Sequence, residues 1–256
     1  MRITPSIAYR NFLTSVELLN ERQGVASQQV ASGKKLLHLN DSPAGSAELG
    51  GLRDELSEID QYRSNADSSG FFLGVADSAL NSVYNLTTTI FTRVSAVSSE
   101  TNAAHRASTA TEVRALRDQI LWLANTEARG RHIFAGSRVT SSPFVISGDT
   151  VTYQGDAEVS EVTVADGLEV PQCLVGSSVF SALFDSIQAI VEALDSGDQA
   201  AVQSALSQFS TSLRDLSQAR VQVGARLSEL QSIGPVHDSQ ESNIKTRIGR
   251  VQDADL

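Results

Sequence analysis

The chain has 256 residues, a formal net charge of −10 and only 5% aromatic residues. This length can hold one or two domains, and the scarcity of aromatic residues favours an elongated helical architecture over a large enzyme-like core. The negative charge argues against general binding to nucleic acids or membrane surfaces, because both require a positive field. Residues 1–40 carry net +3 and residues 41–256 carry net −13, which marks the N-terminal segment as a separate unit.

Targeting and redox features are sparse. Cys173 is the only cysteine, so an intrachain disulfide is impossible and a thiolate metal site is not expected. Arg2, Arg10 and Glu17 fall where a secretory signal peptide needs its apolar core, and the chain contains no run of 18 apolar residues that would span a membrane. These patterns predict a protein that is cytoplasmic or exported without a cleavable signal.

Residues 6–32 predict an amphipathic helix. The stretch contains no proline, and its apolar side chains recur at alternating steps of three and four residues, as in a narrow coiled-coil seam. Ser32-Gly33 is expected to end the helix, because glycine is favoured just past a helix terminus. The connector over residues 33–41 carries three leucines and is expected to be packed, with Lys34 and Lys35 solvated. The seam consists of Tyr9, Phe12, Val16, Leu19, Gln23, Ala26 and Val30.

Residues 43–99 predict one long helix, around which the rest of the chain is organised. Ser42 is the expected N-cap, and Pro43 takes the first helical position, where its missing N–H costs nothing. At about 1.5 Å per residue such a helix is roughly 85 Å long, so it needs an equally long partner. Four interior glycines, each costing on the order of 1 kcal/mol, argue against a wholly unbroken rod. Its stripe consists of Leu73, Ala76, Leu80, Val83, Thr87, Ile90, Val94 and Val97.

A second helix and a β-rich segment follow. Residues 100–106 are polar and predict the end of the rod, after which Thr109 and Glu112 fit a capping box. The helix that they open should fold back along the rod and end before Gly130, with Trp122 packed rather than available to stack on a ligand. Residues 133–176 change to short alternating runs among prolines and glycines, which predicts a small β-rich insert.

Residues 177–256 return to the helical period. Ser177 or Ser178 is the expected cap of a helix that Gly197 stops, and Asp198 then opens the last helix. The last helix is the long partner that the rod requires, although Gly234-Pro235 should kink or break it. Arg220 interrupts its stripe and is expected to reach the edge of the bundle or to pair with an acid. The stripe is Val202, Leu206, Phe209, Leu213, Leu216, Arg220, Val223, Leu227 and Leu230.

The fold class predicted from these patterns is mainly α, an elongated antiparallel bundle of long helices with a small β-rich inserted domain. The predicted divisions are an N-terminal helix and connector (1–42), a bundle core (43–132 with 177–256) and the insert (133–176). The seam of residues 6–32 is the candidate assembly interface, and the alternative is that it packs on the bundle. The predicted bundle core contains Leu73, Leu80, Val83, Ile90, Val94, Leu206, Phe209, Leu213, Leu216 and Leu227.

No catalytic, cofactor-binding or metal site is predicted. The histidines lie on different predicted elements without the spacing of a zinc site, and no serine stands in a Gly-x-Ser-x-Gly turn. Acids such as those at positions 54, 55 and 58 are expected on a solvated helix face. The four histidines are His38, His105, His132 and His237.

The order of motifs resembles the flagellin family. Ala31-Ser32-Gly33-Lys34-Lys35 follows the first helix, and Asn40-Asp41-Ser42-Pro43-Ala44-Gly45 opens the long one. Met1-Arg2-Ile3-Thr4 resembles the start of the family's hook–filament junction proteins more than that of filament-forming flagellins. The other motifs that carry the likeness are Leu123-Ala124-Asn125-Thr126, Gly130-Arg131-His132-Ile133-Phe134-Ala135-Gly136-Ser137, Ser142-Pro143-Phe144, Tyr153-Gln154-Gly155-Asp156 and Val223-Gly224-Ala225-Arg226-Leu227.

The resemblance implies a structural protein of the bacterial flagellum, an adaptor at the hook–filament junction, with no enzymatic activity and no cofactor. Implied partners are other copies in a ring, hook-associated protein 1 on the hook side, flagellin on the filament side and an export chaperone. The family also implies type III export, an extracellular location, and a terminal helix beyond Leu256 that pairs with the first helix and binds the chaperone. Without that helix, the chain is expected to be monomeric. The alternatives are a true flagellin and a secreted helical adhesin or tip protein.

Overall fold

The structure is a computed structural model that describes residues 5–36, 42–98 and 102–253, with side chains from Tyr9 onward. It divides into two compact units, each described here by itself. Unit 1 comprises Met1–Gln61 and Pro235–Leu256, and unit 2 comprises Tyr62–Gly234. The division differs from the one expected from sequence, because each of the two longest helices contributes residues to both units.

The first two helices begin and end where local chemistry predicts. Helix α1 is Pro5–Ser32, and Gly33 follows it with φ +66°. Helix α2 is Pro43–Val97, and the Ser42 hydroxyl accepts a hydrogen bond from the Gly45 amide at 3.1 Å. Its interior glycines do not interrupt it. The connector that was expected to be packed includes residues 37–41. These residues, His38 among them, lie outside the described ranges.

Helix α3 (Ala103–Ala124) begins earlier than predicted. The N-cap is Asn102, whose side chain accepts a hydrogen bond from the Ala104 amide at 3.0 Å. The predicted capping box at Thr109 and Glu112 was wrong, because Thr109 lies inside the helix and its hydroxyl donates to the His105 carbonyl. The Arg93 guanidinium lies 3.1 Å from the Glu112 carboxylate, so α3 does fold back along α2 as expected.

The last helices confirm the expected stop and start at Gly197 and Asp198. A π-helical turn, η1 (Ser177–Ser181), leads into α4 (Ala182–Ser196), in place of the predicted serine side-chain cap. Gly197 ends α4 in the left-handed conformation, and the Asp198 carboxylate accepts from the amides of Ala200 and Ala201 at the start of α5 (Gln199–Gln252).

The break predicted at Gly234-Pro235 was wrong, because α5 continues through Pro235. Proline removes only one backbone donor from the helix, and the acceptor that it leaves is the carbonyl four residues earlier. That acceptor belongs to Gln231, an exposed residue. The helix therefore tolerates the proline at a cost of about 3 kcal/mol relative to alanine.

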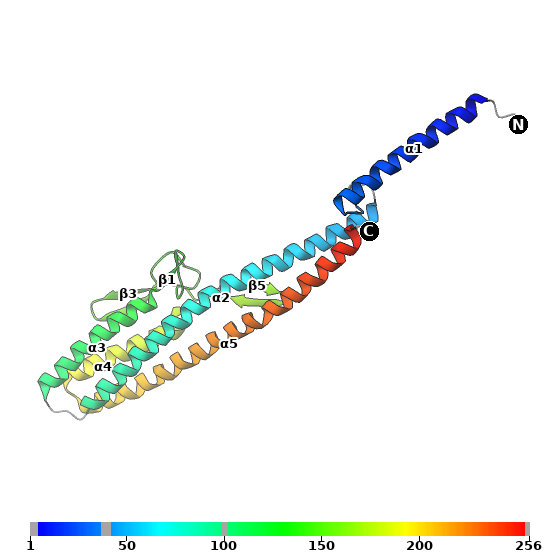
Figure 1. Cartoon of the computed structure of the whole chain (residues 1–256). Coiled ribbons are helices and arrows are strands. Elements are labelled where there is room, and N and C mark those ends of the chain that lie inside the picture. The colour runs from blue at the N-terminus through cyan, green and yellow to red at the C-terminus, as the bar shows by residue number, and fades with distance from the viewer. Residues whose placement is uncertain (1–4, 37–41, 99–101, 254–256) are drawn as a thin grey trace. The chain divides into compact units, whose positions relative to one another are not determined.

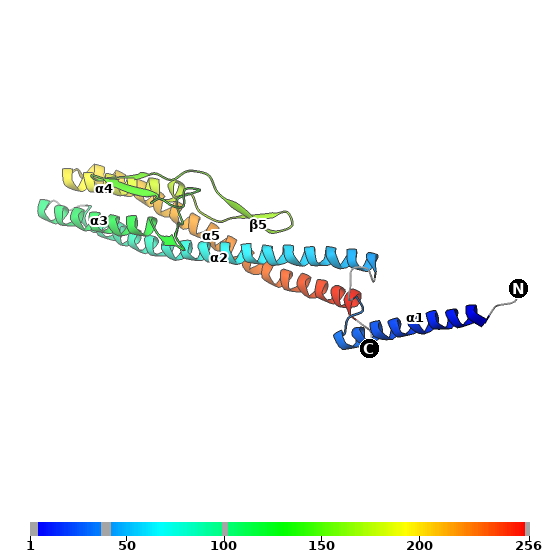
Figure 2. The same ribbon diagram turned by 90° about the horizontal axis from the view of Figure 1, so that it is seen from above.

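The β-rich segment consists of three separate two-stranded antiparallel hairpins. Its strands are short, as the alternating runs predict, and Tyr153 lies opposite Phe144 in the second hairpin. In the third, Val162 pairs with Val170. Figure 2 shows this hairpin, labelled β5, beside the helices of unit 2. The strands are β1 (Glu127–Ala128), β2 (Arg131–His132), β3 (Phe144–Ser147), β4 (Thr150–Tyr153), β5 (Glu161–Ala165) and β6 (Leu168–Pro171).

The core of unit 2 lies between α2, α3, α4 and α5. In Figure 1, α3 and α4 lie alongside the later part of α2 and the first part of α5. Gly70 lies close to Leu230 and Tyr84 lies beneath Arg220, so α2 and α5 run antiparallel. Of the ten residues expected in the bundle core, Leu206, Leu213 and Leu227 are half-buried, whereas Leu73, Leu80, Val83, Ile90, Val94, Phe209 and Leu216 are buried.

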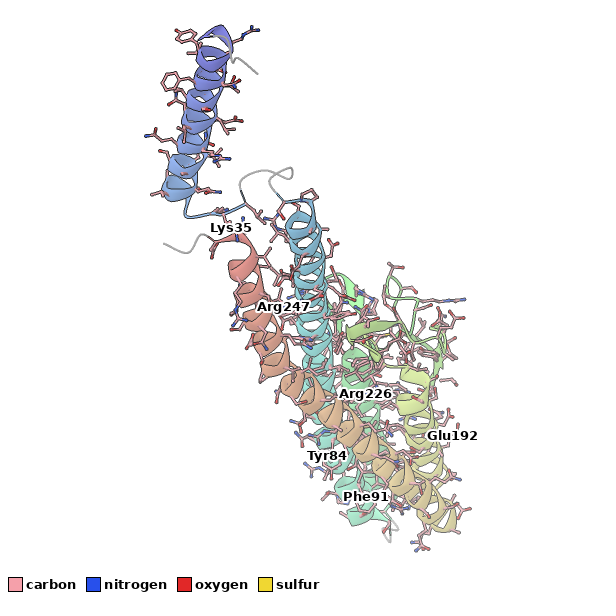
Figure 3. All side chains as sticks on the ribbon, turned by 90° about the vertical axis from the view of Figure 1, so that its right-hand side faces the viewer. Lys35, Tyr84, Phe91, Glu192, Arg226 and Arg247 are labelled. Carbon is pink, nitrogen blue, oxygen red and sulfur yellow. The ribbon has the colours of Figure 1, made fainter. Side chains whose placement is uncertain are left out.

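One aromatic contact and one exposed aromatic side chain differ from the predictions for this unit. The Arg220 guanidinium lies over the Tyr84 ring, 5.4 Å from its centroid, instead of pairing with an acid. Figure 3 labels Tyr84 on α2. Trp122 was expected to pack, yet its side chain is 75% exposed on α3. It sits between apolar neighbours in sequence, but the helix turns it to the face opposite the buried Ile120 and Ala124.

Within the described residues, one stretch (Ser177–Ser196) is long and apolar enough to pass a composition test for a membrane span, and more than half of it is buried inside the fold.

Candidate assembly surface

The predicted seam on α1 is uncovered in the structure. Tyr9, Phe12, Leu19 and Val30 are 64%, 63%, 62% and 64% exposed. Val16 is half-buried, Ala26 is exposed, and Leu13, Leu18 and Val25 add further exposed apolar surface. Exposed apolar surface of this extent on one helix is typical of a surface that another chain covers. The alternative, that the seam packs on the bundle, stays a prediction.

The C-terminal end of α1 is tied to the end of α5 within unit 1. The Lys35 amide donates to the Gln252 carbonyl at 2.7 Å, and Lys34 forms a β-bridge with Asp253. The Gln29 side-chain amide also donates to the Lys35 carbonyl at 3.0 Å, which holds the turn after α1. These contacts anchor one end of the seam through backbone groups. Sequence periodicity could not have indicated them, because backbone pairing carries no residue signature here.

A small apolar cluster, separate from the core of unit 2, joins the first turns of α2 to the last turns of α5. Arg247 of α5, labelled in Figure 3, lies 3.6 Å from the Glu55 carboxylate of α2. Both side chains of this ion pair are 54% exposed, so it contributes little to stability. Asp54 and Glu58 are likewise exposed, as expected for a solvated face. The cluster contains Leu52, Ile59 and Ile244, with Leu56, Ile248 and Val251 packed around them.

In unit 2 the β3–β4 hairpin is fastened to α3 at both ends. At one end, Asn125 donates to the Phe144 carbonyl and accepts from the Phe144 amide, both at 2.9 Å. At the other, the buried Arg117 donates to the carbonyl of Asp149 in the hairpin turn at 3.0 Å. Arg114 contacts Asp195 of α4 and approaches Asp149. Sequence reasoning singled out none of the residues at the second end.

A tight loop junction explains why glycines recur in the 130–156 motifs. A Cβ on Gly136 would lie 2.5 Å from the Asp156 carbonyl oxygen, and one on Gly155 would lie 2.7 Å from the Ala135 carbonyl oxygen. The Asp156 carboxylate accepts hydrogen bonds from the hydroxyl and the amide of Ser137. These bonds, led by the one from the hydroxyl, hold the pKa of Asp156 below its usual value. The Tyr153 hydroxyl lies 2.8 Å from the Asp156 carbonyl, and burial raises the pKa of this phenol.

No group of three or more His, Cys, Asp or Glu side chains in the described ranges could hold a metal ion. Cys173 is buried. A groove of about 450 Å³ lies between the end of β6 and α5. Arg226, labelled in Figure 3, lines it together with Glu161, Asp215 and Cys173.

The comparisons with known proteins agree with this arrangement. A family model described as the bacterial flagellin N-terminal helical region matches residues 3–139. The chain belongs to this family. Its members are structural proteins of the bacterial flagellum.

Two curated relatives of this flagellin-family chain carry the same name. The chain is 24% identical over 260 residues to flagellar hook-associated protein 3 of Escherichia coli, which covers 91% of this chain and 82% of the relative. It is 23% identical over 285 residues to the protein of the same name from Salmonella typhimurium, which covers 100% of this chain and 89% of the relative.

Among solved structures, a putative flagellar hook-associated protein from Vibrio parahaemolyticus has the same fold. Its TM-score is 0.75 at 22% identity, over 83% of this chain and 100% of that one. The predicted fold class, long helices in a bundle with small antiparallel sheets, is therefore confirmed.

Proposed function

We propose that this chain is a non-enzymatic adaptor at the junction between the hook and the filament of the bacterial flagellum. The observation that carries the proposal is the uncovered apolar seam of α1, anchored at one end to the end of α5. Membership of the flagellin family and the likeness to hook-associated protein 3 of two bacteria support it.

The partners that we propose are further copies of the chain in a ring, hook-associated protein 1 on the hook side and flagellin on the filament side. An export chaperone is a further proposed partner. The protein acts outside the cell, after export through the flagellar type III channel without a cleavable signal. Burial of the seam against neighbouring helices drives assembly, because each fully buried Leu or Phe side chain contributes roughly 1.5–3 kcal/mol.

The test replaces seam residues without disturbing the fold. Phe12→Glu combined with Leu19→Glu places charge on the seam, and we expect an unchanged thermal midpoint because both side chains are already exposed. The matched control, Thr14→Glu with Gln28→Glu, puts the same two charges on the opposite face of α1. Isolated hooks carrying hook-associated protein 1 are mixed with each variant, and flagellin is then added.

The seam variant should fail to bind the hooks and to support filament growth, whereas the control should do both. Binding by both variants would overturn the role of the seam. Growth of long filaments from the chain alone, without hooks, would identify a filament-forming flagellin instead.

A further inference from the structure

The acidic residues of this chain are concentrated in one continuous segment. Residues 139–213 contain ten Asp or Glu and no Lys, Arg or His, whereas the rest of the chain holds twenty acids and twenty Lys or Arg. Some acids of the segment are compensated by partners within unit 2: Asp149 and Asp195 by arginines of α3, and Asp156 by Ser137. Of the others, Glu161, Asp166 and Glu169 lie on the β5–β6 hairpin.

One face of the β5–β6 hairpin is apolar and the other is acidic. Val164 and Val170 are buried against the core of unit 2. The opposite face carries Glu161 across from Pro171 and Glu169 across from Thr163, because cross-strand partners share a face. Both glutamates are exposed, and neither has an ion-pair partner among the residues that the structure describes.

The turn between β1 and β2 carries a positive charge, Arg129, that is complementary to the acidic face of the β5–β6 hairpin. Arg129 has φ +51° and Gly130 φ +76°, as in a two-residue type I′ turn. The Arg129 guanidinium lies over the ring of Phe71, 4.0 Å from its centroid, and Phe71 is 39% exposed. No carboxylate pairs with Arg129 in the described part of the chain. A guanidinium stacked on a ring keeps its in-plane N–H donors free for a carboxylate.

The turn and the hairpin lie on different sides of α2. The Asn65 side-chain amide donates to the Thr163 carbonyl at 2.8 Å and fixes β5 on one side of α2. Phe71 follows six residues later, so at 3.6 residues per turn the two side chains are about 120° apart around the helix axis. Complementary patches on different sides of one chain join copies head to tail, and such contacts close into a ring when the rotation permits.

We propose that the patch formed by Arg129 and Phe71 of one copy binds the acidic face of the β5–β6 hairpin of a second copy. The occupant is a second copy because the complementary charges belong to the same chain and form no ion pair with one another in its described part. This contact rests on the proposed function, where it supplies the lateral contact of the ring. It is independent of the α1 seam.

Sedimentation velocity at low ionic strength tests the contact. All proteins carry Phe12→Glu with Leu19→Glu, which removes association through α1. In contrast to the monomer that the family resemblance implies, the parent should associate as its concentration rises, and salt should weaken the association. Arg129→Glu alone, and Glu161→Lys with Glu169→Lys, should each lower the association constant by on the order of tenfold or more. An equimolar mixture of the two variants should associate again, since each then meets opposite charge.

The mixture keeps the test informative, because a misfolded variant would not be rescued by a second one. Arg214→Glu and Asp185→Lys, two exposed charges that belong to neither patch, serve as matched controls and should leave association unchanged. A parent that stays monomeric, unchanged association in either reversal, or a mixture no tighter than its components would overturn the proposal. Failure of the hook-binding assay alone would count against the proposed function and leave this contact standing.

Discussion

Arg117 of α3 lies buried beneath the β3–β4 turn and donates from Nη1 to both the carbonyl oxygen and the carboxylate of Asp149, at 3.0 Å and 3.3 Å. Its Nε and the second terminal nitrogen reach the Asp118 carboxylate. The side chain is only 6% exposed, so the charge is tolerated because its donors are satisfied. This arginine occupies a position in the helical period where the chain otherwise places apolar residues.

Replacing this arginine should loosen the hairpin. We expect Arg117→Met to lower the free energy of unfolding by about 1–3 kcal/mol, because the hydrogen bonds to Asp149 are lost while much of the packing is kept. Chemical denaturation measures the change. Arg93→Met is the matched control: its ion pair with Glu112 is 60% and 42% exposed, and its loss should cost about 0–1 kcal/mol. Equal losses in both variants would contradict the role assigned to Arg117.

The attachment of the β3–β4 hairpin should depend on the side-chain amide of Asn125. Its side chain mimics a paired strand residue by donating to and accepting from the backbone of Phe144. Aspartate can accept but not donate at neutral pH, so Asn125→Asp should cost about 1–3 kcal/mol. Asn125→Ala also removes the acceptor of the Phe144 amide, so hydrogen exchange at that amide should accelerate in this second variant. Asn85→Asp, on an exposed face of α2, should change stability by less than about 0.5 kcal/mol. Unaltered exchange at Phe144 in Asn125→Ala would refute the pairing.

Asp156 should make stability sensitive to acid. Hydrogen bonds from Ser137 lower the pKa of this carboxyl in the folded state. A group with a depressed folded pKa contributes stability above its unfolded pKa and loses that contribution as pH falls through the folded value. We therefore expect the difference in thermal midpoint between the parent and Asp156→Asn to be largest near neutrality and to shrink below about pH 4. Ser137→Ala should shrink the same difference, and a pH-independent difference would show that the carboxylate charge is irrelevant.

Replacing Pro235 by alanine should increase the stability of α5. Alanine at this position restores a backbone donor to the carbonyl of Gln231 and removes a steric conflict, so Pro235→Ala should stabilise α5 by up to about 3 kcal/mol. Amide exchange across residues 231–239 should slow. Val236→Ala, an exposed neighbour, is the control for a change of side chain alone. Faster exchange in Pro235→Ala would mean that the proline contributes a contact that alanine cannot make.

The sequence by itself determined the helices, because caps and periodicity are local. Ser42-Pro43, Gly33, Gly197 and Asp198 place helix ends through bonds to residues at most a few positions away. The same locality identified the alternating runs that form β4 and β5. Prediction from local patterns was wrong at Thr109. The capping pattern there lies inside a helix whose N-cap is Asn102.

Only the tertiary structure decided which faces are covered. Periodicity groups side chains on one face of a helix, but it cannot say whether another element lies against that face. For this reason Trp122 was expected to be packed and is exposed. Arg117 and Arg129 contact Asp149 and Phe71 only in the folded chain, and sequence spacing indicates neither contact. Such contacts join residues far apart in sequence, so their energies depend on the closed fold and leave no local pattern.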